Sequence, residues 1–203
     1  RGVGKTTTAR LLAKALLCTA RQGPEPCGAC AACRELVAGT LVDVIEIDGA
    51  SNRGIDDIRT LRENVRYAPA RGRYKIYIID EAHQLTKEAF NALLKTLEEP
   101  TPHVVFVLAT TQPHEMPLTV LSRCQRFDFK PIPPELLSAS LERVLREEKV
   151  EFDPAALPLL VRSAEGSLRD ALSLLDTALA YGGGRLAADS LAQLLRPTAP
   201  AQV

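Results

Sequence analysis

The first residues of the chain combine glycine, lysine and threonine in a pattern suited to phosphate binding. Gly2-Val3-Gly4-Lys5-Thr6-Thr7 opens a helix-like segment and matches the second half of a G-x-x-x-x-G-K-[ST] phosphate loop. Glycines let backbone N–H groups face phosphate oxygens, Lys5 supplies a positive charge, and the Thr6 hydroxyl is a ligand for Mg²⁺. A chance glycine-rich helix start is the alternative. Because the chain begins at Arg1 inside this motif, we expect further residues before it.

Two carboxylates close an apolar strand further along the chain. Ile76–Ile79 is followed directly by Asp80 and Glu81, and ligands of parallel α/β sheets bind beyond the carboxyl ends of the strands. There Asp80 would hold Mg²⁺ through water, and Glu81 would orient and deprotonate an attacking water. Alone, the pair is more typical of a solvated acidic turn. The phosphate loop upstream favours a site for ATP with Mg²⁺.

Four of the five cysteines are close together in the sequence. Cys18, Cys27, Cys30 and Cys33 include two overlapping C-x-x-C steps, and such thiolates can form a tetrahedral site with four sulfur ligands. Zinc is the metal that this site favours, because neighbouring thiolates repel one another without a cation. Two disulfides or free thiols are the alternatives. Cys124 is interpreted as a small buried hydrophobic residue.

Strand-like and helix-like segments alternate, which favours an α/β fold with a parallel sheet. Strands are predicted at Val42–Ile47, Tyr74–Ile79, Val104–Leu108 and, at the sheet edge, Gln125–Phe129. Helices are predicted at Lys5–Leu17, Ile55–Val65, Thr86–Leu97 and Pro117–Leu121, and then at Glu135–Glu148, Pro154–Ala164, Ser167–Tyr181 and Ala187–Leu195.

The proline-rich segment at 130–134 interrupts this alternation, because proline removes backbone donors and disfavours helix in the preceding residue. We therefore expect a phosphate-loop domain at 1–131, which includes the cysteine module at 18–33. A small all-α domain follows at 132–196. Residues 197–203 are expected to form a linker or the start of a longer segment.

Composition restricts the class of protein. The chain has 203 residues, 46% of them hydrophobic, and its 25 Lys and Arg balance its 25 Asp and Glu. Such a chain can bury a core and has no overall basic field, so any contact with nucleic acid must be local. Its apolar runs are too short to span a bilayer and no signal segment is evident. We expect a cytoplasmic protein without a membrane partner.

Several motifs together resemble the AAA+ ATPases, and in wording the gamma/tau-type subunits of bacterial DNA polymerase III clamp loaders. The motifs are Gly-Val-Gly-Lys-Thr-Thr, Ile-Ile-Asp-Glu-Ala-His, Ala-Thr-Thr at 109–111, Leu-Ser-Arg-Cys at 121–124 and Gly-Ser-Leu-Arg-Asp-Ala at 166–171. The resemblance implies a phosphate-loop ATPase domain with a helical lid, and a motor that uses ATP to load a sliding clamp onto primer-template DNA. It supports a structural zinc at the cysteines. It also implies further clamp-loader subunits in a pentamer, formed through a C-terminal collar domain that we expect to be absent from this sequence.

The resemblance assigns roles to three more residues. Thr111 corresponds to a sensor near the γ-phosphate, and Arg169 to a second sensor carried by the lid. Arg123 corresponds to an arginine finger that completes a neighbouring subunit's site. An ordinary strand-end threonine is the alternative for Thr111. An arginine that faces solvent or pairs with Asp170 is the alternative for Arg169.

Ser51, Asn52 and Arg53 precede the helix predicted at Ile55–Val65. Polar side chains and free N–H groups at a helix start can take a DNA phosphate, but a turn without a ligand is an equal alternative. For the whole chain, a non-hydrolysing clamp-loader relative or another AAA+ DNA remodeller remains the alternative function. The ATPase interpretation is favoured by the presence of Lys5, Thr6, Asp80, Glu81, Thr111 and Arg169. No polymerase active site is evident.

Overall fold

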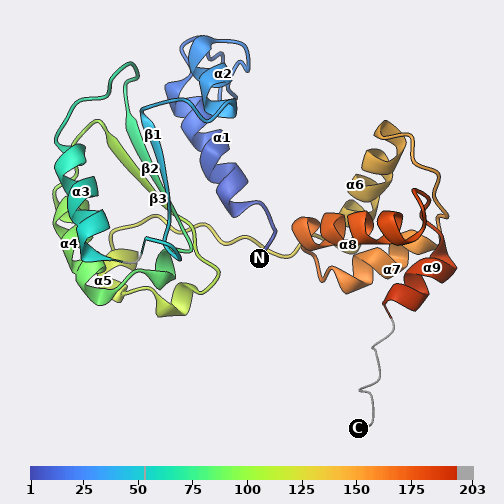
Figure 1. The fold of residues 1–203 in the computed structure, drawn as a ribbon. Coiled ribbons are helices and arrows are strands. Elements are labelled where there is room, and N and C mark those ends of the chain that lie inside the picture. The colour runs from blue at the N-terminus through green and yellow to red at the C-terminus, as the bar shows by residue number, and fades with distance from the viewer. Residues whose placement is uncertain (53, 196–203) are drawn as a thin grey trace, which may run out of the picture. The chain divides into compact units, whose positions relative to one another are not determined.

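The computed structural model describes residues 1–52 and 54–195, and these form two compact units (Figure 1). One unit is Lys5–Phe127. The other joins Arg1–Gly4 to the chain from Asp128 onward. In this part of the chain, no helix is both long enough and apolar enough to cross a membrane.

A parallel three-stranded sheet forms the centre of the first unit. Its strands are β1 (Val44–Asp48), β2 (Lys75–Asp80) and β3 (Val104–Leu108), in the order β1-β2-β3. Asp48 is the register partner of Asp80, and Ile79 is the partner of Leu108. The three strands therefore end at one edge, where the loops that follow them meet.

Helices cover both faces of this sheet (Figure 1). Ile76 and Ile78 of β2 pack toward α1 (Lys5–Leu17), beside which lies α2 (Ala31–Val37). Tyr77 and Ile79 pack on the opposite face. That face is covered by α3 (Ile55–Val65), α4 (Lys87–Glu98) and α5 (Leu118–Leu121), with the short 3₁₀ turns η1 (Ala82–Gln84) and η2 (Pro113–Glu115) between them. Burial on both faces explains the continuous apolar run of β2.

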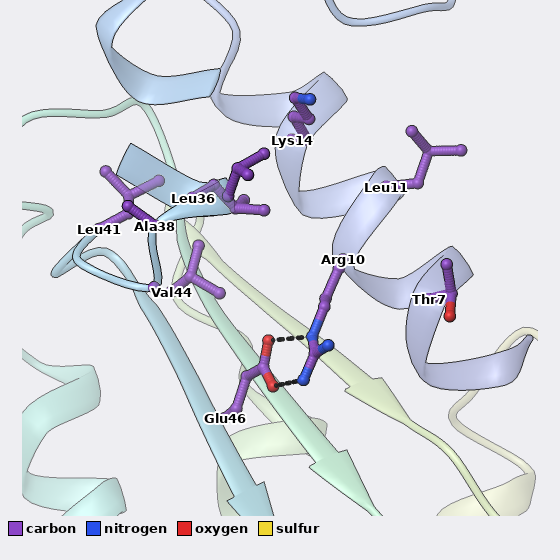
Figure 2. Close-up of a pocket in the computed structure, with 11 residues that line it drawn as sticks. Thr7, Arg10, Leu11, Lys14, Leu36, Ala38, Leu41, Val44 and Glu46 are labelled. Atoms are coloured by element: carbon purple, nitrogen blue, oxygen red, sulfur yellow. Dashed lines mark hydrogen bonds and ion pairs between the residues drawn. The ribbon is translucent and has the colours of Figure 1, made fainter. Parts of the chain in front are cut away.

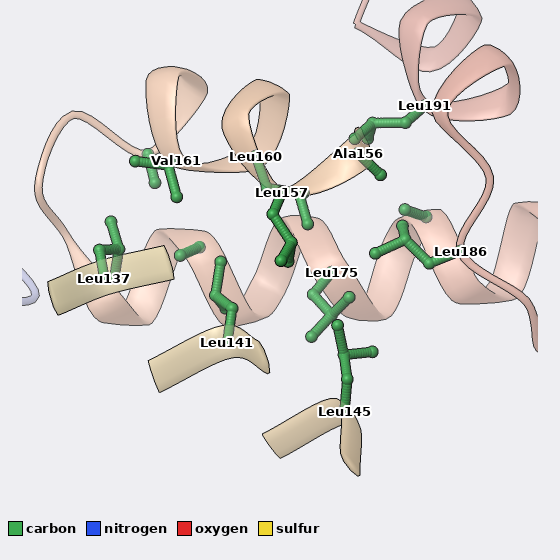
Figure 3. Close-up of a cluster of buried hydrophobic side chains, with 13 residues drawn as sticks. Leu137, Leu141, Leu145, Ala156, Leu157, Leu160, Val161, Leu175, Leu186 and Leu191 are labelled. Carbon is green, nitrogen blue, oxygen red and sulfur yellow. The ribbon is translucent and has the colours of Figure 1, made fainter. Parts of the chain in front are cut away.

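The second unit is a bundle of α6 (Pro134–Glu147), α7 (Ala156–Ser163), α8 (Leu168–Tyr181) and α9 (Ala188–Leu194). Leucines at helical spacing on α6, Leu137, Leu141 and Leu145, point into a core with Leu160 and Leu175 (Figure 3). The Ser167 side chain caps α8 by accepting the Asp170 N–H at 3.2 Å. This unit has the all-α architecture that the sequence predicted.

Gln125–Phe129 is not a strand, and the prediction was wrong. The segment has no regular secondary structure and joins no ladder of the described sheet, and its alternating Phe127 and Phe129 are 71% and 41% exposed. Alternation indicates a strand only where a partner edge and a covering layer exist. The other predicted elements are present, with ends that shift by one or two residues.

Asp43, just before β1, binds the loop that leads into the central strand β2. The residue is 2% exposed, and its carboxylate accepts hydrogen bonds from the backbone N–H groups of Ala70, Arg71 and Gly72 at 2.6, 2.9 and 2.8 Å. Burial acts to raise the pKa of Asp43, but these three donors outweigh it and hold the pKa below its ordinary value of 3.8. The ionised carboxylate therefore stabilises the loop that leads into β2.

We predict that Asp43→Asn lowers the free energy of unfolding by about 1.5 to 3 kcal/mol at neutral pH, because an amide cannot accept from all three donors. The contribution of Asp43 to the free energy of unfolding is fully present above pH 3.8, the ordinary pKa that applies in the unfolded chain. It is lost as the pH falls through the lower pKa of the folded state. Urea unfolding over a series of pH values measures this. The exposed Asp56→Asn is the control, with a change under about 0.5 kcal/mol. A difference between Asp43→Asn and wild type that grows on acidification would contradict the assignment.

Candidate nucleotide site and cysteine cluster

The start of α1 and the end of β2 meet through one short hydrogen bond. Thr6 Oγ1 donates to Asp80 Oδ2 at 2.6 Å. Lys5 is the first residue of α1, directly before Thr6, and it is half-buried. A hydroxyl and a carboxylate oxygen in contact at a helix N-terminus are the hard oxygen ligands that Mg²⁺ prefers beside a phosphate. The structure thus brings together the Thr6 and Asp80 that the sequence assigned to magnesium.

Glu81 follows Asp80 in a left-handed conformation, with φ of 45°. This conformation is uncommon for a residue with a side chain and is concentrated at functional sites. It is held by the Glu81 N–H, which donates to Asp80 Oδ1 at 2.9 Å, and by the Ala82 N–H, which donates to the Ala109 carbonyl at 2.9 Å. Thr111 Oγ1 donates to Glu81 Oε2 at 2.8 Å. Two predicted site residues from neighbouring strand ends, Glu81 and Thr111, are therefore in direct contact.

Sequence reasoning missed three side chains next to Glu81. His83 Nδ1 lies 2.9 Å from Thr110 Oγ1 and 3.4 Å from Glu81 Oε2, and His83 Nε2 lies 3.1 Å from Gln112 Nε2. The η1 turn directs the His83 side chain into the protein, where it is 4% exposed. The signal in the sequence was a histidine two residues after the strand-ending pair.

Gly49, which follows β1, packs against the same backbone. Its N–H donates to the Asp80 carbonyl at 2.8 Å, and a Cβ at this position would lie 2.8 Å from the Glu81 carbonyl oxygen. Only glycine permits this approach. The loop after β1 is therefore fixed against Asp80 and Glu81.

The predicted DNA-contact residues lie in this loop. Ser51 Oγ donates to Asp48 Oδ2 at 2.7 Å, and Asn52 Nδ2 donates to the Asp48 carbonyl at 3.1 Å. Arg53 lies outside the described residues. The two described side chains thus make the local bonds of a turn, which is the alternative that the sequence left open.

The remaining phosphate-loop residues, Gly2 to Gly4, group with the other unit. Gly2 and Gly4 have φ of 65° and 92°, the positive values that such a loop requires of its glycines. Within that unit the Leu168 N–H donates to the Gly2 carbonyl at 3.1 Å. A Cβ on Gly2 would lie 3.2 Å from the Cβ of Arg169. Arg169, the predicted second sensor at the start of α8, therefore lies next to Gly2.

Arg123 follows α5 and binds groups of its own surface. Its guanidinium donates to Glu98 Oε1 at 2.8 Å and to the Thr119 carbonyl at 2.7 Å. The Arg123 side chain is 35% exposed. Among the described residues, its hydrogen-bond partners lie on α4, on α5 and at Ser122 just after α5, and none is Lys5, Thr6, Asp80 or Glu81.

A separate groove of about 640 Å³ lies between α1, α2 and β1. Arg10 Nε and Nη2 donate to the two carboxylate oxygens of Glu46, both at 2.7 Å (Figure 2). This bond to Glu46 is the main reason that the pKa of Arg10 lies above its ordinary value. Thr7, counted among the nucleotide-binding residues in the sequence, lines this groove. The groove contains none of Lys5, Thr6, Asp80 or Glu81, so it is distinct from the nucleotide site.

The four predicted cysteine ligands converge. Cys18 follows α1, Cys27 lies on the loop, and Cys30 and Cys33 begin α2. Their four sulfur atoms lie within 4.8 Å of one another, and none is in a disulfide. A zinc ion with Zn–S bonds of about 2.3 Å would place tetrahedral sulfurs about 3.8 Å apart. The donor set and its spacing therefore fit a zinc ion.

The thiols of this cluster have unequal acidity. A backbone hydrogen bond from Cys27 lowers the pKa of Cys18, and one from Cys33 lowers the pKa of Cys30 to about 5. Burial raises the pKa of Cys33 to about 12. Metal ligation requires thiolates, so Cys33 is the ligand whose ionisation depends most on a cation. Cys124 is half-buried against the α3 and α4 core, and burial raises its pKa.

Two family models match consecutive parts of the chain. Residues 1–133 match "DNA polymerase III, delta subunit", and residues 137–184 match "DNA polymerase III clamp loader subunit, ATPase lid domain". The first match spans the whole Lys5–Phe127 unit, and the second spans most of the helical bundle.

Curated relatives and solved structures agree with these matches. The chain is 54% identical over 195 residues to DNA polymerase III subunit tau of Escherichia coli K12, covering 96% of this chain and 30% of that protein. It is 50% identical over 183 residues to the tau subunit of Bacillus subtilis 168, covering 90% and 32%. The chain thus spans about a third of the length of these relatives.

The Thermotoga maritima RuvB Holliday junction branch migration motor has a similar structure, with a TM-score of 0.64 and 17% identity, covering 95% of this chain and 57% of that one. At this identity the likeness shows the fold alone, and the fold is that of an AAA+ ATPase with a helical lid. The chain therefore belongs to the family of DNA polymerase III clamp-loader subunits, with tau and gamma subunits among its relatives.

Proposed function

We propose that this chain is the ATP-hydrolysing motor part of a clamp-loader subunit, which uses ATP to load a sliding clamp onto primed DNA. The observation that carries the proposal is the contact chain at the strand ends, from Thr6 to Asp80 and from Glu81 to Thr111. It holds side chains for a metal, a water and a phosphate at one edge of the sheet. The family membership agrees with this activity.

The proposed hydrolysis assigns one task to each group. Backbone N–H groups of Gly2, Val3 and Gly4 and the Lys5 ammonium bind the phosphate oxygens. Glu81 orients a water and accepts its proton as the water oxygen bonds to the γ-phosphorus and the bond to the bridging oxygen breaks. Thr6 and Asp80 would hold Mg²⁺, which would supply charge neutralisation at the phosphates. Thr111 holds Glu81 and lies near the γ-phosphate.

Partners enter the proposal through Arg123. Its hydrogen bonds to Glu98 and Thr119 place it on the surface of its unit, where it can reach the nucleotide of an adjacent subunit. We assign it as an arginine finger that acts in trans. Arg169 is assigned as the second sensor of the lid, and Ser51, Asn52 and Arg53 as candidate contacts to the primer-template.

A non-hydrolysing relative is the second candidate, because the family model for residues 1–133 is described as a delta subunit. Against it stands the complete contact set of Thr6, Asp80, Glu81 and Thr111, which a purely structural subunit does not require. Turnover measurements separate the two functions.

The cysteine cluster is assigned to one structural zinc ion. All four thiols are used as ligands, so the metal has no open position for water or substrate. The cluster lies at the opposite end of α1 from Lys5 and Thr6. We therefore assign to zinc the stability of the α1–α2 connection and no step of hydrolysis.

We predict that Lys5→Ala and Glu81→Gln have different effects in the full-length protein. Lys5→Ala removes charge that binds both ground state and transition state, so nucleotide affinity and turnover both fall. Glu81→Gln removes only the group that accepts a proton from the water, so this variant should bind ATP and not hydrolyse it. Nucleotide titration and phosphate release measure the two effects. Equal loss of ATP affinity in both variants would show that the roles are wrong.

We predict about one tightly bound zinc per chain, and Cys27→Ser should reduce the zinc content and lower the stability more than ATP turnover. Metal analysis and thermal unfolding measure this. Cys124→Ser is the matched control, because Cys124 lies outside the cluster and its loss should leave the zinc content unchanged. Well under one zinc per wild-type chain, or four thiols that react freely without a chelator, would overturn the assignment.

We predict that Arg123→Ala in the assembled loader keeps ATP binding and loses most hydrolysis, since a finger in trans is worth about 10³- to 10⁵-fold in turnover. The chain alone should hydrolyse ATP very slowly. Assemblies that mix Arg123→Ala with Lys5→Ala subunits should regain part of the activity, because some interfaces then pair a working finger with a working phosphate loop. The trans role is wrong if mixtures with proven subunit exchange regain none.

A further inference from the structure

The His83 side chain is buried, has a polar partner on each ring nitrogen, and touches the residue to which hydrolysis is assigned. It is 4% exposed. Thr110 and Gln112, the neighbours of Thr111, contact its two nitrogens at 2.9 and 3.1 Å. His83 therefore joins the turn after β2 to the segment after β3, on either side of the Glu81–Thr111 bond.

The hydrogen bonds select one tautomer of the ring. Gln112 Nε2 is an amide donor, so His83 Nε2 is the acceptor and the ring proton lies on Nδ1. Thr110 Oγ1, which already accepts the Gln112 backbone N–H at 3.0 Å, also accepts from Nδ1. His83 Nδ1 also lies 3.4 Å from Glu81 Oε2. The Nδ1–H therefore donates to Thr110, and its positive end lies beside the Glu81 carboxylate.

This arrangement makes the two oxygens of Glu81 unequal. Oε2 accepts from Thr111 Oγ1 at 2.8 Å and lies 3.4 Å from His83 Nδ1. Within the described residues, Oε1 accepts no hydrogen bond from the protein. Oε1 is thus the oxygen that can take a proton from water, and rotation of the carboxylate would break the contacts of Oε2.

We propose that His83 is a positioning residue for hydrolysis: with Gln112 fixing its tautomer, it keeps the protonated Nδ1 beside Oε2 of Glu81 and thereby holds Oε1 toward the attacking water. The inference rests on the proposed function, in which Glu81 acts on that water. It adds that the catalytic carboxylate is held by both the β2 turn and the β3 loop. A histidine that only fills the core would affect stability and would not act through Glu81.

The test compares His83→Asn with His83→Gln in the full-length protein within its hydrolysing assembly. The Asn amide nitrogen lies near the position of Nδ1 and preserves the donor, whereas the Gln amide lies near Nε2 and does not. We expect His83→Gln and His83→Ala to lower kcat about 10- to 100-fold with an unchanged KM for ATP. His83→Asn should stay within a few-fold of wild type. His114→Ala, on the exposed η2 turn, is the matched histidine control with unchanged kcat.

A second arm tests whether His83 acts through Glu81. In a Glu81→Gln background, His83→Ala should cause no further loss of turnover, because the group that it positions is already inactive. The same fold loss in both backgrounds would overturn the proposal. So would equal kcat values for His83→Asn and His83→Gln. Gln112→Ala, which frees the tautomer and leaves the ring in place, should also lower kcat at constant KM, and it provides a second variant if His83→Ala does not fold.

The proposed function and this inference fail in different ways. If Glu81→Gln itself hydrolyses ATP like wild type, the proposed role of Glu81 is wrong. If Glu81→Gln is inactive and His83→Gln turns over like wild type, Glu81 is catalytic and the positioning role of His83 is wrong.

Discussion

The parallel register of three strands is the constraint on which the nucleotide site depends. Asp48 lies opposite Asp80 and Ile79 opposite Leu108. The residues that follow each strand therefore lie at the same edge of the sheet, although they are far apart in the sequence. The start of α1 then needs one bond, from Thr6 to Asp80 at 2.6 Å, to bring the phosphate-binding end of a helix to that edge. Burial of β2 by helices on both faces fixes the edge in place.

Around this edge, backbone contacts hold a conformation that would otherwise be unfavourable. Glu81 has a positive φ, which costs about 1 to 3 kcal/mol for a residue with a side chain. The Ala82 N–H binds Ala109, and Gly49 comes so close that a Cβ would meet the Glu81 carbonyl at 2.8 Å. Loops after all three strands thus share the task of holding one residue. Hydrogen bonds and close packing offset this strain. The left-handed conformation places the Glu81 side chain against Thr111.

Much of this could be predicted from the sequence. Helical and strand periodicity located α1, α3 and β3, and the parallel-sheet rule together with the phosphate-loop motif assigned Asp80 and Thr6 to one site. Periodicity could not find His83, because its burial depends on a 3₁₀ turn and on partners from another strand end. Nor could it find Gly49, which must be glycine because the Glu81 carbonyl lies so close to it. Asp43 was also missed, because the N–H groups that bind its carboxylate lie far away in the sequence. It also gave a false strand at Gln125–Phe129, since alternation does not show whether a partner edge exists.

The two charged groups proposed for hydrolysis differ in how firmly they are held, and the difference agrees with their tasks. Glu81 must present one oxygen to a water, so a fixed geometry is an advantage, and its neighbour His83 is 4% exposed with both nitrogens bound. Arg123 must reach another subunit, and it is paired with Glu98 where both side chains are substantially exposed. An exposed ion pair contributes at most about 1 kcal/mol, far less than a γ-phosphate offers to a guanidinium in trans. The Glu98 contact can therefore be exchanged on assembly at little cost, whereas the contacts that orient Glu81 are present in the chain before any partner binds.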